Sequence, residues 1–303
     1  MGGDICISLL YEVVKYADFV VLVDDCCPLK TGNKVLKKNI SSKLTVLFNK
    51  KNLGVGGATK IGFKRLLQKD CDVIVKIDAD FQMNPADIPR MVQPIFQNKY
   101  DATKGNRFTN IDKLLNMPKL RLIGNTFLSY LTKFSTGYWE LFDPTNGFIA
   151  FRKEILENID LNKTDDKFFF ETDLLFRCSL KNVSIKNIEI DAVYDNTYSS
   201  LNPLKELPIF LIKNIKLLLK RVIYQYYVLD FNPGSIELFL SIITGFFASV
   251  IGLNSLYLTS KTRELTSAGT SSLFTVLSII SLQMFLAFIY YDCSTKVFFR
   301  GRK

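Results

Sequence analysis

The sequence predicts an α/β domain with a parallel sheet, followed by two long apolar helices. Within residues 1–203, apolar segments typical of buried strands alternate with segments of helical periodicity. Near the C-terminus, two apolar runs are each long enough to cross a hydrocarbon core of roughly 30 Å. The chain of 303 residues is long enough for one sizeable domain and these additional helices.

Acidic residues stand where the predicted strands end. The strands are expected in ADFVVLVDD (17–25), KLTVLFN (43–49) and CDVIVKIDAD (71–80), with a glycine-rich turn and helix in KKNLGVGGATKIGFKRLLQ (50–68). Two acidic pairs close the first and third strands: Asp24 with Asp25, and Asp78 with Asp80. Because open parallel sheets bind ligands at the carboxyl ends of their strands, both pairs fall where a site is expected.

The second acidic pair predicts a metal site. Asp78 and Asp80 follow an apolar strand, and Gln82 adds an amide oxygen within reach. Such oxygen ligands select hard cations, Mg²⁺ or Mn²⁺, which bind substrate phosphates. We therefore expect a metal–diphosphate complex at these residues. The alternative is a structural loop whose acids cap the helix that begins near NPADIP (84–89).

Composition excludes several kinds of site. The chain has no histidine, which excludes Ser-His-Asp and Cys-His catalysis. Its six cysteines are scattered without the paired spacing of zinc ligands. The net charge is +10, but the basic residues gather beside the apolar runs without interleaved aromatic residues. We therefore expect no nucleic-acid partner.

The two apolar runs, residues 236–258 and 273–291, predict a transmembrane hairpin joined by a short polar linker. A buried helical pair of a soluble protein is the alternative. Lysines and arginines flank the hairpin on both sides, so both ends and the amino-terminal domain are expected in the cytoplasm, in a multi-pass membrane protein. The first residues show no basic region or cleavage site of a signal peptide.

An amphipathic segment precedes the hairpin. In residues 204–230 isoleucines and leucines recur at helical spacing with lysines between them. This pattern suits a helix in the membrane interface, with an ordinary surface helix as the alternative. The expected domains are therefore 1–203, the juxtamembrane segment 204–230, and the hairpin with its basic tail, 231–303.

Five stretches in this order resemble family 2 glycosyltransferases. They are VVLVDD (20–25), NLGVGGATKIGF (52–63), VIVKIDADFQMNPADIPRMV (73–92), GNRF (105–108) and DPTNGFIAFRKEIL (143–156). Together with the hairpin they are most similar to dolichol-phosphate mannose synthases and bacterial polyprenyl-phosphate glycosyltransferases. The resemblance covers most of residues 8–200. It implies a GT-A fold, a GDP- or UDP-hexose donor, a polyprenyl phosphate acceptor and a divalent metal.

The resemblance assigns the donor side of the site. Asp24 and Asp25 match the acidic pair near the donor nucleotide. Asn52, Gly54 and Gly57 match the glycine-rich turn that follows the next strand.

The metal and acceptor residues are assigned in the same way. Asp78, Asp80 and Gln82 match the metal-binding Asp-Ala-Asp-x-Gln motif, in which Asp78 also faces the donor and Asp80 is catalytic. Arg107 matches an arginine that grips the lipid phosphate, and Arg121 stands where a second one is expected. Asp143 and Gly147 fall in the acceptor-side motif.

The nature of the acceptor decides whether a general base is required. A phosphate acceptor is already ionised, so attack at the anomeric carbon needs positioning and charge compensation. A sugar hydroxyl would require a carboxylate base, for which Asp143, Glu171 and Asp173 are candidates. A structural role in helix capping is the alternative for Glu171 and Asp173.

Two departures from the family pattern concern the donor side. The first strand of the family, which ends in a Pro-Ala-Tyr-Asn-Glu-like motif, is missing, and we expect a truncated reading frame or a start site called too late. That strand would be central in the sheet, so its loss should expose apolar edges and weaken nucleotide binding. In CCPLKT (26–31), Leu29 stands where an aspartate is usual.

Three functions are consistent with the sequence. The first is a membrane-anchored inverting transferase that moves a hexose to polyprenyl phosphate, and a homo-oligomer is compatible with it. The second is a transferase acting on a sugar acceptor in surface-polysaccharide assembly, although the Gln-x-x-Arg-Trp motif of processive synthases is absent and Trp139 is the only tryptophan. The third is an inactive, truncated homologue that serves as a membrane scaffold.

Overall fold

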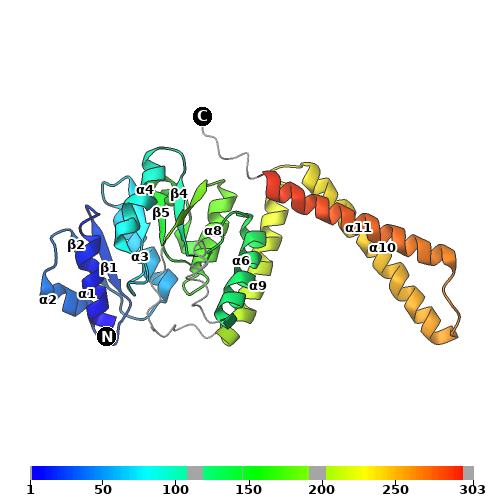
Figure 1. Cartoon of the computed structure of the whole chain (residues 1–303), viewed down its shortest axis with the longest axis horizontal. Helices are drawn as coiled ribbons and strands as arrows, with labels where there is room; N and C mark the ends of the chain where they lie inside the picture. The colour runs from blue at the N-terminus through cyan, green and yellow to red at the C-terminus, as the bar shows by residue number, and fades with distance from the viewer. Residues whose placement is uncertain (1, 108–118, 145, 191–202, 296–303) are drawn as a thin grey trace. The chain divides into compact units, whose positions relative to one another are not determined.

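A computed structural model describes residues 2–107, 119–144, 146–190 and 203–295 (Figure 1). The chain divides into two compact units, one that runs to Leu219 and one that begins at Lys220. The expected boundary at residue 203 is where helix α9 begins, and the division into units falls inside that helix.

The first unit alternates helices and strands. Its elements are α1 (Gly2–Val13), β1 (Val20–Asp24), α2 (Thr31–Lys38), β2 (Leu44–Phe48), α3 (Val55–Leu67), β3 (Val73–Lys76), η1 (Pro85–Asp87), α4 (Ile88–Phe96), β4 (Ala102–Asn106), α6 (Lys119–Thr136), β5 (Ile149–Arg152), α7 (Lys153–Glu157), η2 (Leu161–Lys163), α8 (Phe170–Leu180), β6 (Ile185–Glu189) and α9 (Pro203–Ile223). The three predicted strands are confirmed as β1, β2 and β3.

The strands form two sheets. β1 and β2 pair in parallel, and the second sheet has the order β3-β5-β4-β6. The expectation of a parallel sheet is correct for β1–β2 and β4–β6 but wrong for β5, which runs antiparallel to both β3 and β4. The reason is that the chain enters β5 from the loop 143–148, whose Phe148 carbonyl accepts from Gly105 at the end of β4. β5 therefore starts beside the carboxyl end of β4 and runs antiparallel to it.

Helices cover both faces of the second sheet. Side chains of a strand alternate between faces, so Phe151 of β5 packs with Phe63 of α3 and Leu174 of α8. Its neighbour Ala150 packs with Met91 of α4 on the opposite face. Both clusters are buried, and the two layers of helices fix the positions of the strand ends.

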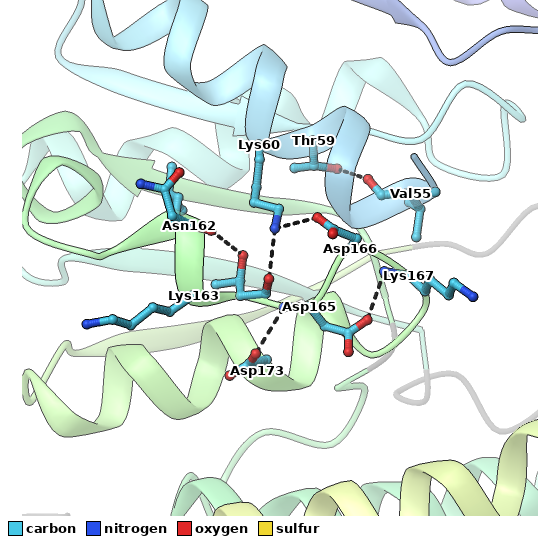
Figure 2. Close-up of polar contacts among 12 residues, drawn as sticks. Val55, Thr59, Lys60, Asn162, Lys163, Asp165, Asp166, Lys167 and Asp173 are labelled. Atoms are coloured by element: carbon cyan, nitrogen blue, oxygen red, sulfur yellow. Dashed lines mark hydrogen bonds and ion pairs between the residues drawn. The ribbon is translucent and has the colours of Figure 1, made fainter. Parts of the chain in front are cut away.

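The first turn of α3 packs tightly against the loop 164–167 (Figure 2). Gly57 donates its backbone N–H to the Asp166 carbonyl at 2.9 Å. Lys60 donates to the Thr164 carbonyl at 2.8 Å and forms an ion pair of 2.6 Å with Asp166. A side chain at Gly56 would come within 2.7 Å of Phe170 Cβ and collide with the backbone of this loop.

The second unit is a helical hairpin. After a short π-helical turn, η3 (Tyr224–Val228), it contains α10 (Pro233–Thr262) and α11 (Ala268–Thr295). Both helices are long and apolar enough to cross a membrane, and they include the two apolar runs found in the sequence. Ser241 and Ser281 donate reciprocally to each other's backbone carbonyl, at 3.0 and 2.9 Å.

A buried ion pair closes the base of this hairpin. Arg221 donates to both carboxylate oxygens of Asp292 at 2.7 and 2.9 Å, and Tyr226 donates to the same carboxylate at 2.6 Å. Such pairing satisfies a charge that would otherwise be costly to bury.

We predict that Gly56→Ala destabilises the first unit by about 1–3 kcal/mol, because the added methyl group collides with the loop 164–167. Gly62→Ala in the same helix is the matched control, since the nearest atom to its Cβ, Val23 Cγ2, is 3.4 Å away. There alanine should be neutral or stabilising by up to about 1 kcal/mol. Chemical unfolding followed by the fluorescence of Trp139 measures both, and equal stabilities of the two variants would contradict this packing.

Candidate active site

A group of buried charges lies at the carboxyl ends of β3 and β4. Lys76, the last residue of β3, forms ion pairs with Asp78 at 2.6 Å and with Glu171 of α8 at 3.1 Å. Burial by itself would lower the pKa of Lys76, but the two carboxylates outweigh it and raise that pKa above its ordinary value. Lys76 therefore stays charged and fixes Asp78 on one side.

The loop that leads into β5 fixes Asp78 on the other side. A Cβ at Gly147 would lie within 2.6 Å of Asp78 Cγ and would also collide with the Lys76 ammonium. Glycine at this position lets the backbone approach the carboxylate closely. Gly147, expected on the acceptor side, thus borders the first aspartate of the predicted metal site.

Arg107 and Asp143 lie together in this group. The Arg107 guanidinium donates to the two Asp143 oxygens at 2.7 and 2.9 Å, and the Asp143 side chain is fully buried. This two-pronged geometry fixes the plane of the guanidinium. Both residues were predicted from the sequence, but the ion pair between them was not.

Lys104 is a site residue that the sequence analysis missed. It lies in the middle of β4, is 1% exposed, and donates to the Asn146 carbonyl. Burial lowers the pKa of Lys104 to about 8, although the charges of Asp143 and Glu171 oppose this shift. The signal that could have found it is a single lysine among small or polar residues in the short segment ATKGN (102–106), directly before Arg107.

Asp80 and Gln82 follow a sharp turn beyond β3. Phe81 has a left-handed backbone with φ 59°, and the Gln82 N–H donates to Asp80 Oδ1 at 3.1 Å. Partial desolvation and the charge of Asp78 raise the pKa of Asp80, while the Gln82 N–H opposes that rise. The helix that follows is capped by Asn84, which accepts from Ala86 N–H, so the acids are not needed as its cap.

The oxygen ligands of Asp78, Asp80 and Gln82 fit a divalent cation that is also bound by a phosphate. Among the described residues, no group of three acidic, cysteine or histidine side chains is close enough to hold a metal. One carboxylate oxygen of Asp78 accepts from Lys76. The oxygens that could bind the cation are therefore those of Asp80, with the second oxygen of Asp78 and the amide oxygen of Gln82. Mg²⁺ and Mn²⁺ commonly take few protein oxygens and complete their shell with water and substrate phosphate. These residues therefore fit the metal that the sequence predicts.

The first acidic pair holds the loops that follow β1 and β2. Asp24 accepts from the backbone N–H groups of Cys27 at 2.7 Å and Gly32 at 2.6 Å. Asp25 accepts from the side chain of Asn49 at 2.7 Å and from the backbone of Gly54 at 2.8 Å. It thereby joins the ends of β1 and β2 to the glycine-rich turn.

The remaining predicted residues lie near these elements. Asn52 accepts from Gly54 N–H at 3.1 Å, and Gly54 needs a glycine because its φ is 89°. Arg121 belongs to α6, but its side chain lies outside what the structure describes. Asp173 accepts from Asp165 N–H at 3.0 Å and pairs with Arg177 at 3.4 Å, so it braces the loop 164–167 from the first turn of α8.

Comparison with known proteins identifies the family. The family model described as "Glycosyl transferase family 2" matches residues 6–160, about half of the chain. The chain therefore belongs to glycosyl transferase family 2, and it is a glycosyltransferase.

Several relatives carry names that describe lipid-phosphate substrates. A UDP-N-acetylglucosamine–dolichyl-phosphate N-acetylglucosaminyltransferase of Methanococcus voltae is 30% identical over 50% of this chain and 60% of its own. A dolichol-phosphate mannosyltransferase of Pyrococcus furiosus is 30% identical over 50% of this chain and 42% of its own. An undecaprenyl-phosphate mannosyltransferase of Micrococcus luteus is 30% identical over 61% of this chain and 75% of its own.

A solved structure supports the fold. Glucosyl-3-phosphoglycerate synthase of Mycobacterium tuberculosis aligns with a TM-score of 0.53 and 17% identity, over 73% of this chain and 76% of that one. At this identity the likeness concerns the fold alone, which is the GT-A type that the sequence predicts.

The low pKa of Lys104 predicts a pH dependence of stability. The folded state releases this proton near pH 8 and the unfolded state near 10.5, so the unfolded state binds more protons between those values. Stability should therefore rise with pH in this window, by up to about 3 kcal/mol relative to Lys104→Met. Urea unfolding from pH 7 to 10.5, followed by Trp139 fluorescence, measures it. Lys186→Met, on the exposed side of β6, is the control, and identical pH profiles for both variants would refute the assignment.

Proposed function

We propose that this glycosyltransferase moves a hexose from a nucleotide-sugar donor to polyprenyl phosphate at a membrane surface. An acceptor phosphate oxygen attacks the anomeric carbon. A new carbon–oxygen bond forms on one face of the sugar while the bond to the nucleoside diphosphate breaks on the other. The configuration inverts, and the diphosphate leaves with the electron pair.

The observation that carries this proposal is the pairing of every candidate base with a cation. Asp143 is held by Arg107, Glu171 by Lys76, and Asp173 by Arg177. A carboxylate that already holds a cation is not positioned by the structure to accept a proton from a substrate hydroxyl through the same oxygen. An acceptor phosphate needs no such base, whereas a sugar hydroxyl does. The site therefore suits an acceptor that arrives already ionised.

The cations of the site supply what a phosphate acceptor requires. Arg107, held in plane by Asp143, carries a delocalised positive charge of the kind that binds phosphate oxygens. Lys76 and Lys104 lie buried beside it and add positive charge to the floor of the site. A divalent cation held by Asp80, with Asp78 and Gln82, would neutralise charge that develops on the leaving diphosphate.

The donor side rests on the first acidic pair and the glycine-rich turn. Asp24 and Asp25 hold their loops through backbone N–H groups, which places both carboxylates at the end of β1. We assign the donor nucleotide to this edge, together with Asn52, Gly54 and Gly57. We assign a GDP- or UDP-hexose as the donor, as the sequence resemblance implies; one relative is named for UDP-N-acetylglucosamine.

Two features support an association of the protein with a membrane. The hairpin helices are apolar enough to span a bilayer, and we place both of their ends and the catalytic unit in the cytoplasm. Helix α9 buries Phe210, Asn214 and Leu217 against the first unit while Ile212 and Ile215 stay exposed. Its lysines flank this exposed apolar row, which is the pattern of a helix lying in a membrane interface.

A transfer assay tests the proposal. Purified full chain is incubated with radiolabelled nucleotide hexoses, undecaprenyl phosphate and Mn²⁺ or Mg²⁺ in detergent, and label is counted in the lipid phase. We expect transfer that falls about 10²–10³-fold in Arg107→Ala and in Asp80→Asn, and that stops with chelator. Arg90→Ala removes an exposed arginine of α4 and should leave transfer unchanged.

Other outcomes identify the alternatives. Label that enters a sugar acceptor but never the lipid would assign the second function, polysaccharide assembly. If a folded chain transfers sugar to no acceptor, the remaining function is the third one, an inactive homologue that serves as a membrane scaffold.

The interfacial role of α9 makes a separate prediction. Replacing Ile212 and Ile215 together by asparagine removes apolar surface from the exposed face, so transfer in vesicles should fall about tenfold. Transfer in detergent should change little. Leu36→Asn, at an equally exposed apolar position of α2, is the control. Equal loss in vesicles and detergent would mean that these residues act in folding rather than at the membrane.

A further inference from the structure

The second helix of the hairpin presents an amide side chain at the middle of its apolar run. Gln283 belongs to α11, and the run extends over residues 273–291. At 1.5 Å of rise per residue, the amide is about 12 Å or more from either end of that run. The Gln283 side chain is exposed on the hairpin surface, and none of the described residues forms a hydrogen bond with it.

Several other polar side chains of the two apolar runs have partners within the hairpin. Ser241 and Ser281 bond across it. Thr244 and Thr275 each donate to a backbone carbonyl of their own helix. Consecutive residues of a helix are about 100° apart around its axis, so Gln283 lies about 200° from the Ser281 contact. The amide therefore points away from α10.

An amide without a partner is unfavourable in hydrocarbon. It carries two N–H donors and an oxygen acceptor, and lipid tails offer neither kind of group. Asn254 of α10 is also exposed, but it lies close to the end of the first run, 236–258, where headgroups and water are within reach. Gln283 is too deep for this, so its partner in a bilayer must come from protein.

The exposed residues around Gln283 form a stripe suited to a second helix. They recur at alternating spacings of three and four residues, which is the a and d pattern of a coiled coil. The stripe consists of Val276, Ile279, Gln283, Leu286 and Tyr290, all of them exposed. In that pattern Gln283 occupies an a position between apolar d positions. A single polar residue at an a position fixes the register and the number of the helices that pair.

We propose that the α11 helices of two copies of this chain pack in parallel along this stripe, with their Gln283 amides hydrogen-bonded to each other. This inference rests on the membrane placement given in the proposed function. Two copies inserted in the same direction, related by a two-fold axis along the membrane normal, carry Gln283 at the same depth. The amide is self-complementary, because each carbonyl can accept from the NH₂ group of the other. A different partner would need its own polar group at that depth, which a second copy supplies by symmetry.

Energy transfer between labelled copies in vesicles tests the proposal. Full chains that carry a donor or an acceptor dye on an added C-terminal tag are reconstituted into phosphatidylcholine vesicles. Flotation in sodium carbonate first verifies that the hairpin is inserted. The lipid content is then raised stepwise, so that specific association separates from random proximity.

We expect energy transfer that follows a monomer–dimer equilibrium, and Gln283→Leu should weaken this association about tenfold. The leucine faces lipid, so the hairpin itself should be undisturbed. Gln283→Asn keeps an amide at this position and should retain most of the association. Asn254→Leu is the matched control, because it removes an exposed amide near the end of a span and should leave the association unchanged.

Equal association of the original chain and Gln283→Leu would overturn the proposal, as would energy transfer no higher than the random level in inserted chains. A stoichiometry other than two, counted by stepwise photobleaching, would overturn the paired arrangement. Chains that fail to insert would contradict the membrane placement as well. Because no nucleotide sugar or acceptor lipid is present, the result does not depend on transferase activity, and Arg107→Ala should associate like the original chain.

Discussion

The need to neutralise buried cations governs the structure of the site. Lys76 of β3 and Lys104 of β4 are buried on the two strands that flank β5, and the Arg107 side chain, just beyond β4, is 11% exposed. An unpaired charge there would be very costly, so each cation binds a carboxylate or a backbone carbonyl. These partners fix the positions of the Asp78 and Asp143 carboxylates.

The same pairing connects the site to distant segments of the chain. Glu171 reaches Lys76 from α8, and the loop just before that helix binds the first turn of α3 through Lys60 and Asp166. Lys213 of α9 forms an ion pair with Asp165 of that loop. Helix α9 is thus attached, through one loop, to the first turns of α3. A short polar loop therefore connects α3, α8 and α9.

The distribution of charge also separates two kinds of transferase chemistry. Enzymes that activate a hydroxyl group need a carboxylate able to take a proton. Here Asp143, Glu171 and Asp173 each hold a cation. Such a site stabilises negative charge on both the attacking and the leaving group. This balance agrees with relatives named for lipid-phosphate substrates.

The sequence by itself determined the strands β1 to β3, the hairpin helices, the family and most candidate residues, because apolar periodicity and short motifs are local properties. Gly147 and Arg107 were singled out as candidates in this way. Tertiary structure alone decided that β5 runs antiparallel, that Arg107 binds Asp143, and that Lys104 belongs to the site. It also decided that the Gln283 side chain is exposed on the hairpin surface. These features depend on which distant segments meet and on how burial changes the cost of a charge, and neither is encoded in local spacing.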